Sequence, residues 1–349
     1  MNAPRFSVCI PAYNRARLLA PLLDSIFAQD FNDFEVVIAE DRSPEQAEIR
    51  QIAAQYQVRF PGRLTYVENE TNLGFDGNIR KLVATSLGEY CVFMGNDDLM
   101  SPAGLASLAA AINRHPDVGV VLRSYAAFEG DPTRPSQEFR YFPDERFFDA
   151  GVGAAAVFFR RCVVICGVCL HRESAARIVT TELDGTLLYQ IYLVARILFE
   201  KSGVSVPHIV ALYRNGGVPE FGNAEAEKGK FVPADRTVAS SVQFMRGVLQ
   251  VARAVDREHG QGFYNKVVAD YANYSYPFLS IQAWRPRFDF IGYWWALSKL
   301  GFWPYPMFHI YFFSLLVLGE QRSDAIIAWI KRRLGYTPLL GSLSRGKAP

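Results

Sequence analysis

The sequence predicts an α/β fold with a mainly parallel sheet flanked by helices. Short apolar runs at residues 6–10, 34–39, 64–68 and 90–94 are typical of buried strands. The segments between them carry apolar residues three and four positions apart, as in residues 17–28, which is helical spacing. Strands that alternate with helices in this way form βαβ units and parallel sheets.

Composition limits the class of protein. The chain has 349 residues, enough for one large domain or two ordinary ones, and 50% of them are hydrophobic and 14% aromatic. So many aromatic residues indicate a non-aqueous contact somewhere. The net charge of +2 gives a nucleic-acid partner no electrostatic support. We expect no signal peptide, because the first residues lead directly into a strand.

Five cysteines lie inside apolar runs, which predicts reduced core residues of a cytoplasmic protein. They are Cys9, Cys91, Cys162, Cys166 and Cys169. The last three, with His171, are close enough in sequence to suggest a zinc site. Core packing is the favoured interpretation, since no turn separates them in an apolar, strand-like run.

Three of the predicted strands end in polar turns, at residues 11–15, 40–43 and 95–98. Parallel strands place these turns at the same edge of the sheet, so their side chains should converge on one crevice. The third turn carries two adjacent carboxylates, Asp97 and Asp98, which suit Mg²⁺ or Mn²⁺. Taken alone, this pair is more typical of a polar turn before a helix than of a metal site.

Five short motifs lie within these turns or next to the predicted strands. They are Pro11-x-Tyr13-Asn14, Glu40-Asp41-x-Ser43, Asn72-x-Gly74, Gly88-Glu89-Tyr90 and Asn96-Asp97-Asp98. Together they resemble the family 2 glycosyltransferases of the GT-A fold. The variants at 72–78 and 95–98 are most similar to the bacterial branch of abequosyltransferase-like O-antigen enzymes. The resemblance covers residues 5–125 well and extends loosely to residue 215.

The resemblance implies an inverting, metal-assisted transfer of a sugar from a nucleotide-sugar to a glycan. Asp41 would accept a hydrogen bond from the base, and Tyr13 would stack on the base or close over it. Asp98 would bind Mn²⁺ or Mg²⁺, with Asp97 contacting the metal or the ribose. The predicted donor-binding residues are Pro11, Tyr13, Asn14, Glu40, Asp41, Asn78, Asn96, Asp97 and Arg214. The alternative for Tyr13 and Asn14 is a helix entry.

Two departures from the family pattern affect the metal. Glu40 begins the acidic pair after the second strand, and Arg42 stands where glycine is common. Gly95 stands where the family usually has aspartate, so Asp97 and Asp98 must supply the acidic groups of this turn. We therefore expect modest metal affinity.

Inverting transfer also needs a carboxylate base that takes the proton from the acceptor hydroxyl. The resemblance puts this base downstream, before a helix. Glu182 and Asp184 precede the helical run at residues 187–200. Asp184 is favoured, because it lies in a loop just before the helix start. Its alternative role is that of a turn or N-cap residue.

The second half of the predicted sheet is less regular. We expect a fifth strand at residues 118–122, a long loop that shapes the acceptor side at 129–149, and a strand pair or bent strand at 160–170. Arg80 and Lys81 are expected as solvated helix charges, with a phosphate contact by one of them as the alternative.

Residues 213–230 are rich in glycine and charge, which favours either a mobile flap over the donor or a plain surface loop. Arg214 begins this segment and would contact phosphate in the flap interpretation.

The chain becomes helical from about residue 233, with candidate helices at 238–255, 263–279 and 323–334. Residues 302–319 lack Asp, Glu, Lys and Arg, but their prolines make them marginal for a membrane span. Six basic residues against one acid follow Gln321. Apolar aromatic surface beside basic groups predicts attachment to an anionic membrane surface. The alternative is a helical subdomain or an oligomer interface.

The sequence thus predicts three regions: a nucleotide-sugar-binding half at 1–125, an acceptor-binding half at 126–232 and a helical extension at 233–349. We expect a cytoplasmic glycosyltransferase, peripheral at the inner face of the membrane, acting on a polyprenyl-diphosphate-linked glycan. The alternatives are a nucleotide-sugar-binding or assembly protein with a degenerate site, and a nucleotidyl transferase. The last lacks the basic glycine-rich loop expected after the first strand. The oligomeric state stays open.

Overall fold

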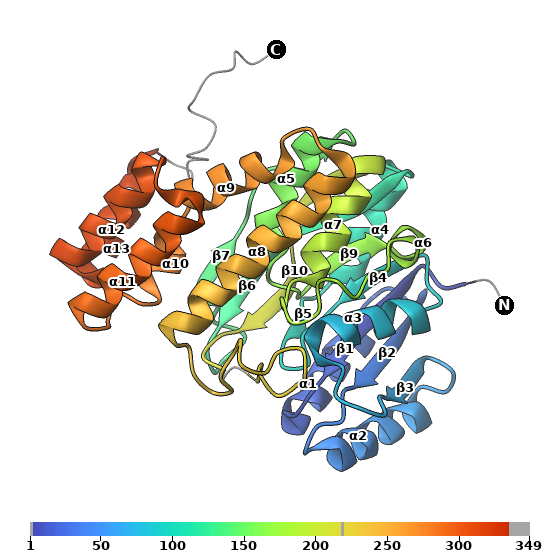
Figure 1. Ribbon diagram of the computed structural model, residues 1–349. Helices are drawn as coiled ribbons and strands as arrows, with labels where there is room; N and C mark the ends of the chain where they lie inside the picture. Colours follow the sequence, from blue (N-terminus) through green and yellow to red (C-terminus); the bar gives the residue numbers. More distant parts are fainter. Residues whose placement is uncertain (1–2, 218–219, 335–349) are drawn as a thin grey trace. The chain divides into compact units, whose positions relative to one another are not determined.

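The computed structural model describes residues 3–217 and 220–334. The chain divides into two compact units, residues 1–235 and 236–349. Figure 1 shows both units, coloured along the sequence.

Unit 1 contains one sheet, to which ten strands of the described residues contribute (Figure 1). Its order is β3-β2-β1-β4-β9-β6-β10-β5, with β7 beside β6 and β8 beside β10. The strands are β1 (Phe6–Ala12), β2 (Phe34–Glu40), β3 (Leu64–Glu68), β4 (Tyr90–Phe93), β5 (Leu99–Met100), β6 (Val118–Phe128), β7 (Gln137–Phe139), β8 (Arg146–Phe148), β9 (Val168–His171) and β10 (Ser202–Arg214). Strands β3, β2, β1 and β4 run parallel, as do β6 and β10, and the other pairs are antiparallel. The predicted α/β sheet flanked by helices is therefore confirmed.

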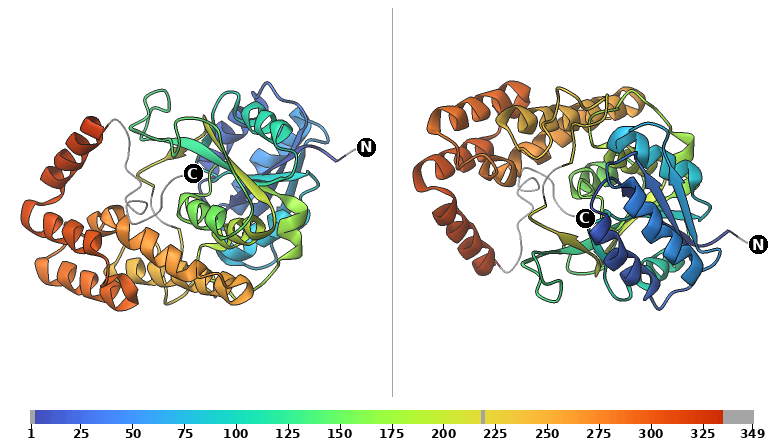
Figure 2. Two further views of the ribbon diagram at one scale, coloured as in Figure 1. Left: turned by 90° about the horizontal axis from the view of Figure 1, so that it is seen from above. Right: turned by 90° about the horizontal axis from the view of Figure 1, so that it is seen from below.

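Helices cover both faces of this sheet (Figure 2). They are α1 (Ala16–Phe27), α2 (Gln46–Arg59), α3 (Gly74–Thr85), α4 (Gly104–Arg114), α5 (Val152–Arg161), α6 (Arg172–Arg177) and α7 (Tyr189–Glu200). Alternate residues of a strand face opposite sides. Phe6, Val8 and Ile10 accordingly join a core with buried residues of α1, α2 and α4. Cys9 points to the other side, where its thiol lies 3.2 Å from Ser86 Oγ at the end of α3.

Residues 160–170 differ from the predicted strand pair. Helix α5 ends at Arg161, a turn follows, and only Val168–His171 is strand. The helix is buried through Ala154, Ala155, Phe158 and Phe159, which are one, three and four positions apart. Residues 162–167 form a turn that is apolar and largely buried, with Cys162 and Cys166 fully buried, so its hydrophobicity matches that of a buried strand, which explains the wrong assignment.

The structure extends two other predictions for this half of the sheet. The predicted strand at 118–122 continues to Phe128, and the expected loop at 129–149 contains the short strands β7 and β8. All five cysteines are buried and free, as core packing requires.

Unit 2 is helical, which confirms the predicted extension. It contains α8 (Val238–His259), α9 (Phe263–Asn273), α10 (Tyr276–Ser280), α11 (Arg287–Leu297), α12 (Pro306–Leu318) and α13 (Glu320–Leu334), with a π-helical segment at Ser298–Phe302. The single helix expected at 263–279 is broken between α9 and α10. In the part of the chain that the structure describes, no helix has both the length and the apolar character needed to cross a bilayer. Arg345 and Lys347, counted in the basic C-terminal charge, lie outside the described residues.

Candidate active site

The three strand-end turns meet, as their parallel strands predict. Asn96 Nδ2 donates to the Asn14 carbonyl at 2.8 Å, and Arg15 Nη1 pairs with Asp97 Oδ2 at 2.5 Å. The Asp41 backbone N–H donates to the Ala12 carbonyl at 3.0 Å. Residues from the ends of β1, β2 and β4 therefore form one polar cluster at one edge of the sheet.

The two adjacent carboxylates have different surroundings. Asp98 is 2% exposed, and its Oδ1 accepts the Arg214 backbone N–H at 2.9 Å. Burial and the neighbouring Asp97 raise the pKa of Asp98 well above its usual value. Asp97 is paired with Arg15, and its carbonyl accepts Arg214 Nε at 2.8 Å. Arg214 reaches this turn because β10 pairs with β5, directly after the two aspartates.

Gly95 makes room for the Asp98 carboxylate. A Cβ at position 95 would lie 2.6 Å from Asp98 Oδ2 and 3.3 Å from Asp97 Oδ1. Both carboxylates thus approach the Cα of Gly95, the position at which the family resemblance implies aspartate. An acidic side chain here would collide with Asp98 as it is placed.

Asp41 is buried in a second group of polar residues. Its Oδ1 accepts hydrogen bonds from Asn69 Nδ2 and from the Leu73 backbone N–H, both at 2.8 Å. Burial raises the pKa of Asp41 to about 6, although these bonds oppose the shift. Asn78 accepts from Asn69 Nδ2 at 3.1 Å and donates to the Ala39 carbonyl at 2.9 Å. Asn78 therefore joins helix α3 to strand β2, and its predicted contact with a donor stays a prediction.

Glu40 shapes the turn after β2. Its two carboxylate oxygens accept the backbone N–H groups of Arg42 at 2.9 Å and Ser43 at 2.8 Å. These bonds hold Arg42 at a positive φ of 54°, where glycine is the commoner residue. The acidic first residue of this pair thus stabilises a turn conformation that Arg42 adopts less readily than glycine.

Tyr13 and Asn14 lie close to both the Asp97–Asp98 turn and the polar residues near Asp41. Burial, together with Glu220 and Asp41, raises the pKa of the half-buried Tyr13. Asn14 Nδ2 donates to Glu220 Oε2 at 3.1 Å, while Asn14 Oδ1 is buried and has no partner among the described residues. A buried acceptor without a partner is a natural contact for a ligand's donor. Pro11 lies in β1, paired with Ala39 of β2.

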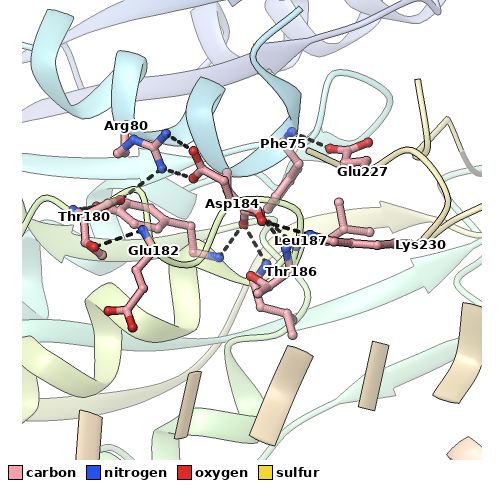
Figure 3. A network of polar contacts seen from close by, with 12 residues as sticks. Phe75, Arg80, Thr180, Glu182, Asp184, Thr186, Leu187, Glu227 and Lys230 are labelled. Carbon is pink, nitrogen blue, oxygen red and sulfur yellow. Dashed lines mark hydrogen bonds and ion pairs between the residues drawn. The ribbon is translucent and has the colours of Figure 1, made fainter. Parts of the chain in front are cut away.

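Asp184 is held by helix α3 (Figure 3). Arg80 Nη1 bonds Asp184 Oδ1, and Arg80 Nη2 bonds Asp184 Oδ2 at 2.8 Å. Lys230 Nζ donates to the Asp184 carbonyl at 3.3 Å. The expectation that Arg80 is a solvated charge was wrong, whereas Lys81 is exposed. Glu182 is exposed, and its side chain points away from the Asp184–Arg80 pair.

Several residues of the site escaped the sequence analysis. Glu227 is buried and accepts the backbone N–H groups of Phe75 at 2.9 Å and Gly222 at 2.8 Å, so the segment expected as a flap is anchored to α3. Residues 218 and 219 of this segment lie outside the described residues. Arg15 and Glu220 were also missed. No local pattern marks these partners, because each is defined by a residue distant in sequence.

The carboxylates present fit a divalent cation modestly. Among the described residues, no group of three or more His, Cys, Asp or Glu side chains is placed to hold a metal ion. Asp97 and Asp98, which converge above Gly95, are a two-carboxylate set. Mg²⁺ and Mn²⁺ sites of this kind use one or two carboxylates and complete the shell with water and phosphate oxygens.

Comparison with known proteins finds a family match in the first half of the chain. Residues 7–166 match the family described as Glycosyl transferase family 2. These residues are therefore similar to family 2 glycosyltransferases. They include the turns that carry Asp41, Asp97 and Asp98, whereas Asp184 and Arg214 lie beyond the matched residues.

The curated relatives that match this chain include named glycosyltransferases. The chain is 30% identical over 171 residues to abequosyltransferase RfbV of Salmonella typhimurium, covering 48% of this chain and 51% of the relative. It is 31% identical over 166 residues to a PGL/p-HBAD biosynthesis glycosyltransferase of Mycobacterium bovis, covering 46% and 61%. The chain thus spans less than two thirds of these relatives.

Solved structures share the fold across both units. Residues 1–349 of TarS from Staphylococcus aureus, in complex with UDP-GlcNAc, align with a TM-score of 0.53 and 18% identity, over 95% of this chain and 92% of that one. Mannosyltransferase PcManGT from Pyrobaculum calidifontis, in complex with GDP-Man and Mn²⁺, aligns with a TM-score of 0.51 and 18% identity, over 97% and 83%. At this identity the likeness concerns the fold alone.

Proposed function

We propose that the chain is an inverting glycosyltransferase that moves a sugar from a nucleotide-sugar to a hydroxyl group of a glycan. The observation that carries the proposal is the convergence of three strand-end turns, with Asp97 and Asp98, inside the segment that matches glycosyl transferase family 2. Binding of nucleotide-sugars by the structural relatives TarS and PcManGT supports the choice of donor class.

The nucleotide binds at the ends of β1 and β2 in this proposal. Tyr13 offers a ring for the base, and the unpaired Asn14 Oδ1 accepts a donor group of the ligand. Asp41 forms the polar floor of this side and keeps its Oδ1 in internal bonds. The ends of β4 and β10 receive the diphosphate, where the Arg214 guanidinium lies beside the Asp97 backbone.

Asp97 and Asp98 would hold Mn²⁺ or Mg²⁺, which supplies positive charge to a leaving diphosphate when bound. Arg15 neutralises Asp97 in the structure and Arg214 fixes the Asp98 carboxylate from the backbone. These contacts give the two adjacent carboxylates different surroundings and therefore different roles. Asp98 is the principal ligand, since Asp97 shares its charge with Arg15.

Asp184 acts as the base at the acceptor. Arg80 engages both of its oxygens, yet each carboxylate oxygen has a second lone pair that can accept the proton of the attacking hydroxyl. Glu182, the alternative base, is exposed and points away from this pair. A base held in one geometry loses little entropy on reaction, which favours Asp184.

A panel of UDP-, GDP-, CDP- and dTDP-sugars tests the function. The wild-type protein should hydrolyse one donor slowly in the presence of Mn²⁺, and Asp98→Ala should abolish that hydrolysis. Asp24→Asn is the matched control, because Asp24 is an exposed carboxylate on α1 that pairs with the exposed Arg59. Equal hydrolysis by the Asp98→Ala variant would contradict the proposal.

A nucleotide-sugar-binding protein without turnover is the second candidate. The pairing of Asp97 with Arg15 and of Asp184 with Arg80 favours it, because both key carboxylates already have cationic partners. Calorimetric titration with nucleoside diphosphates, with and without Mn²⁺, separates the candidates. Tight binding without turnover of any donor on any acceptor would establish this second function.

We further propose that the acceptor is a polyprenyl-diphosphate-linked glycan and that unit 2 attaches to an anionic membrane surface at the cytoplasmic face. The outer faces of α11 and α12 are apolar at helical spacing: Phe288, Ile291 and Trp295 on one, Ile310, Phe313 and Val317 on the other. Phe288 is 89% and Val317 74% exposed. Helices that are apolar all round are normally covered, and a lipid surface would cover these.

The charges near this surface suit anionic headgroups. Lys299 Nζ lies 5.4 Å from the Trp295 ring, and the Arg285 guanidinium lies 4.6 Å from the Trp284 ring. Tryptophan and basic residues together are typical of membrane interfaces.

Sedimentation with vesicles tests the attachment. The protein should bind phosphatidylglycerol vesicles more strongly than phosphatidylcholine vesicles, and Phe288→Ser with Val317→Ser should abolish binding. Deletion of residues 302–349 should also release the protein. Full solubility without detergent and no binding to anionic vesicles would refute the attachment, and self-association by these faces would assign them to a second copy of the chain.

A further inference from the structure

Asp76, in the first turn of α3, makes an unusual set of contacts. It is 1% exposed, and its carboxylate accepts four consecutive backbone N–H groups. Thr186 and Leu187 donate to Oδ2 at 3.0 and 2.9 Å, and Leu188 and Tyr189 donate to Oδ1, both at 2.9 Å. These donors lie 110 to 113 residues away in the sequence.

The four donors span the entry into α7: Thr186 and Leu187 lie in the preceding loop, Leu188 is the N-cap residue, and Tyr189 is the first residue of the helix. A helix leaves its first N–H groups without partners inside the helix, and a nearby side chain usually caps them. Helix α7 has no such cap from its own N-cap residue, Leu188. Asp76 supplies the cap from another helix, and its negative charge suits the positive end of the α7 dipole.

The loop at residues 184–188, which leads into α7, has a strained backbone that the hydrogen bonds to Asp76 stabilise. Leu187 has a φ of 65° and Gly185 a φ of 78°, both in the left-handed region. This region is costly for a leucine. A Cβ at Gly185 would also lie 2.0 Å from the Ala226 carbonyl oxygen, so the loop is pressed against the segment that follows β10.

The same helix also fixes the side chain that this loop carries. Arg80 lies one turn after Asp76 on α3 and binds the Asp184 carboxylate through two hydrogen bonds (Figure 3). Asp184 lies two residues before Thr186, the first donor to Asp76. Helix α3 thus holds the loop backbone through Asp76 and the loop carboxylate through Arg80.

We propose that Asp76 is a positioning residue that sets the conformation of residues 184–189 and thereby aims Asp184 at the acceptor. The inference rests on the proposed function, in which Asp184 is the base. Asp76 does not touch the substrate. It acts by removing the freedom of the loop, since a misplacement of about 1 Å at a catalytic group can lower a rate about 100-fold.

Asp76→Asn is the decisive variant. It keeps the size of the side chain but replaces one acceptor oxygen with an NH₂ group that faces two N–H donors. We expect the amides of residues 186–189 to exchange with deuterium about 100-fold faster, with β1 and β4 unchanged. With the nucleotide-sugar that the wild-type protein hydrolyses, kcat should fall about tenfold or more and the donor KM should change less than about threefold.

The double variant Asp76→Asn/Asp184→Asn separates a positioning role from a purely structural one. If Asp76 acts through Asp184, the double variant should be no slower than Asp184→Asn alone. Additive losses would overturn the proposal. So would unchanged exchange at residues 186–189, a kcat within about twofold of wild type, or equally faster exchange throughout unit 1.

Two further variants complete the test. If Asp76→Asn does not fold, the same assays are carried out on Asp76→Glu, which retains the charge but moves it by one methylene group. Asp24→Asn is the control. Failure of the proposed function would appear as no turnover of any donor by the wild-type protein. The exchange experiment needs no turnover, so it still decides whether Asp76 holds the loop.

Discussion

The two carboxylate centres of unit 1, the Asp97–Asp98 turn and the Asp184 loop, are built in different ways. Asp97 and Asp98 follow one buried strand directly, and neighbouring strand ends surround them. Asp184 lies in a loop without regular structure, and its position depends on Asp76 and Arg80 of α3, more than 100 residues away. Both centres pair a carboxylate with an arginine. Only the geometry of the first could be predicted from a local sequence motif.

This difference indicates which substitutions should disturb each centre. Asp98 is buried between paired strand ends, so substitutions there should change chemistry more than structure. Around Asp184 the geometry is set by few side-chain contacts, so substitutions of remote residues should displace this proposed base. The predictions below test this contrast, from the largest expected effect to the smallest.

Asp184→Asn should cause the largest loss of transfer. Removing a general base typically lowers kcat about 10²- to 10⁴-fold, while donor binding should be unchanged because Asp184 is not part of the donor side. Steady-state kinetics with varied donor check this. Glu182→Gln is the matched control on the same loop. A loss in Glu182→Gln without a loss in Asp184→Asn would move the base to Glu182.

Asp98→Asn should lower transfer about 10²- to 10³-fold, because it weakens the charge stabilisation of the leaving diphosphate. It should also raise the free energy of unfolding at pH 7, since burial and Asp97 already disfavour the ionised Asp98. Urea denaturation and kinetics on the same samples test both effects. A less stable and inactive variant would mean that Asp98 is structural.

Gly95→Ala should lower transfer about 10- to 100-fold with a small effect on stability. The new Cβ would lie 2.6 Å from Asp98 Oδ2 and displace that carboxylate. Gly153→Ala, in helix α5 with open space around its position, is the control. Restored or increased activity in Gly95→Asp would show instead that the missing acid limits the site.

Asp41→Asn should change how stability depends on pH. The pKa of Asp41 is raised from 3.8 to about 6 in the folded protein, so its stabilising contribution is complete below pH 3.8 and is lost as pH rises through 6. A shift of about two units corresponds to about 3 kcal/mol. The wild-type free energy of unfolding should therefore fall more steeply between about pH 4.5 and 7 than that of Asp41→Asn. Parallel curves from urea denaturation would contradict this.

Much of the fold could be predicted because it depends on short-range patterns. Apolar runs of strand length, helical spacing and polar strand ends identified β1 to β4 and their helices. Residues 160–170 could not be fully predicted, because the turn at 162–167 is as apolar as the strand that follows it. The proximity of the strand-end turns could be predicted from topology, because the carboxyl ends of parallel strands lie at the same edge of a sheet.

The sequence by itself determined that the first half of the chain is a parallel α/β domain with acidic turns at one edge, because strand and helix periods and turn residues act over a few positions. Tertiary structure alone decided which distant groups meet them. Arg15 pairs with Asp97, Glu227 anchors the segment after β10, and Asp76 caps α7. Such pairs follow from packing of whole elements, and no local spacing encodes them.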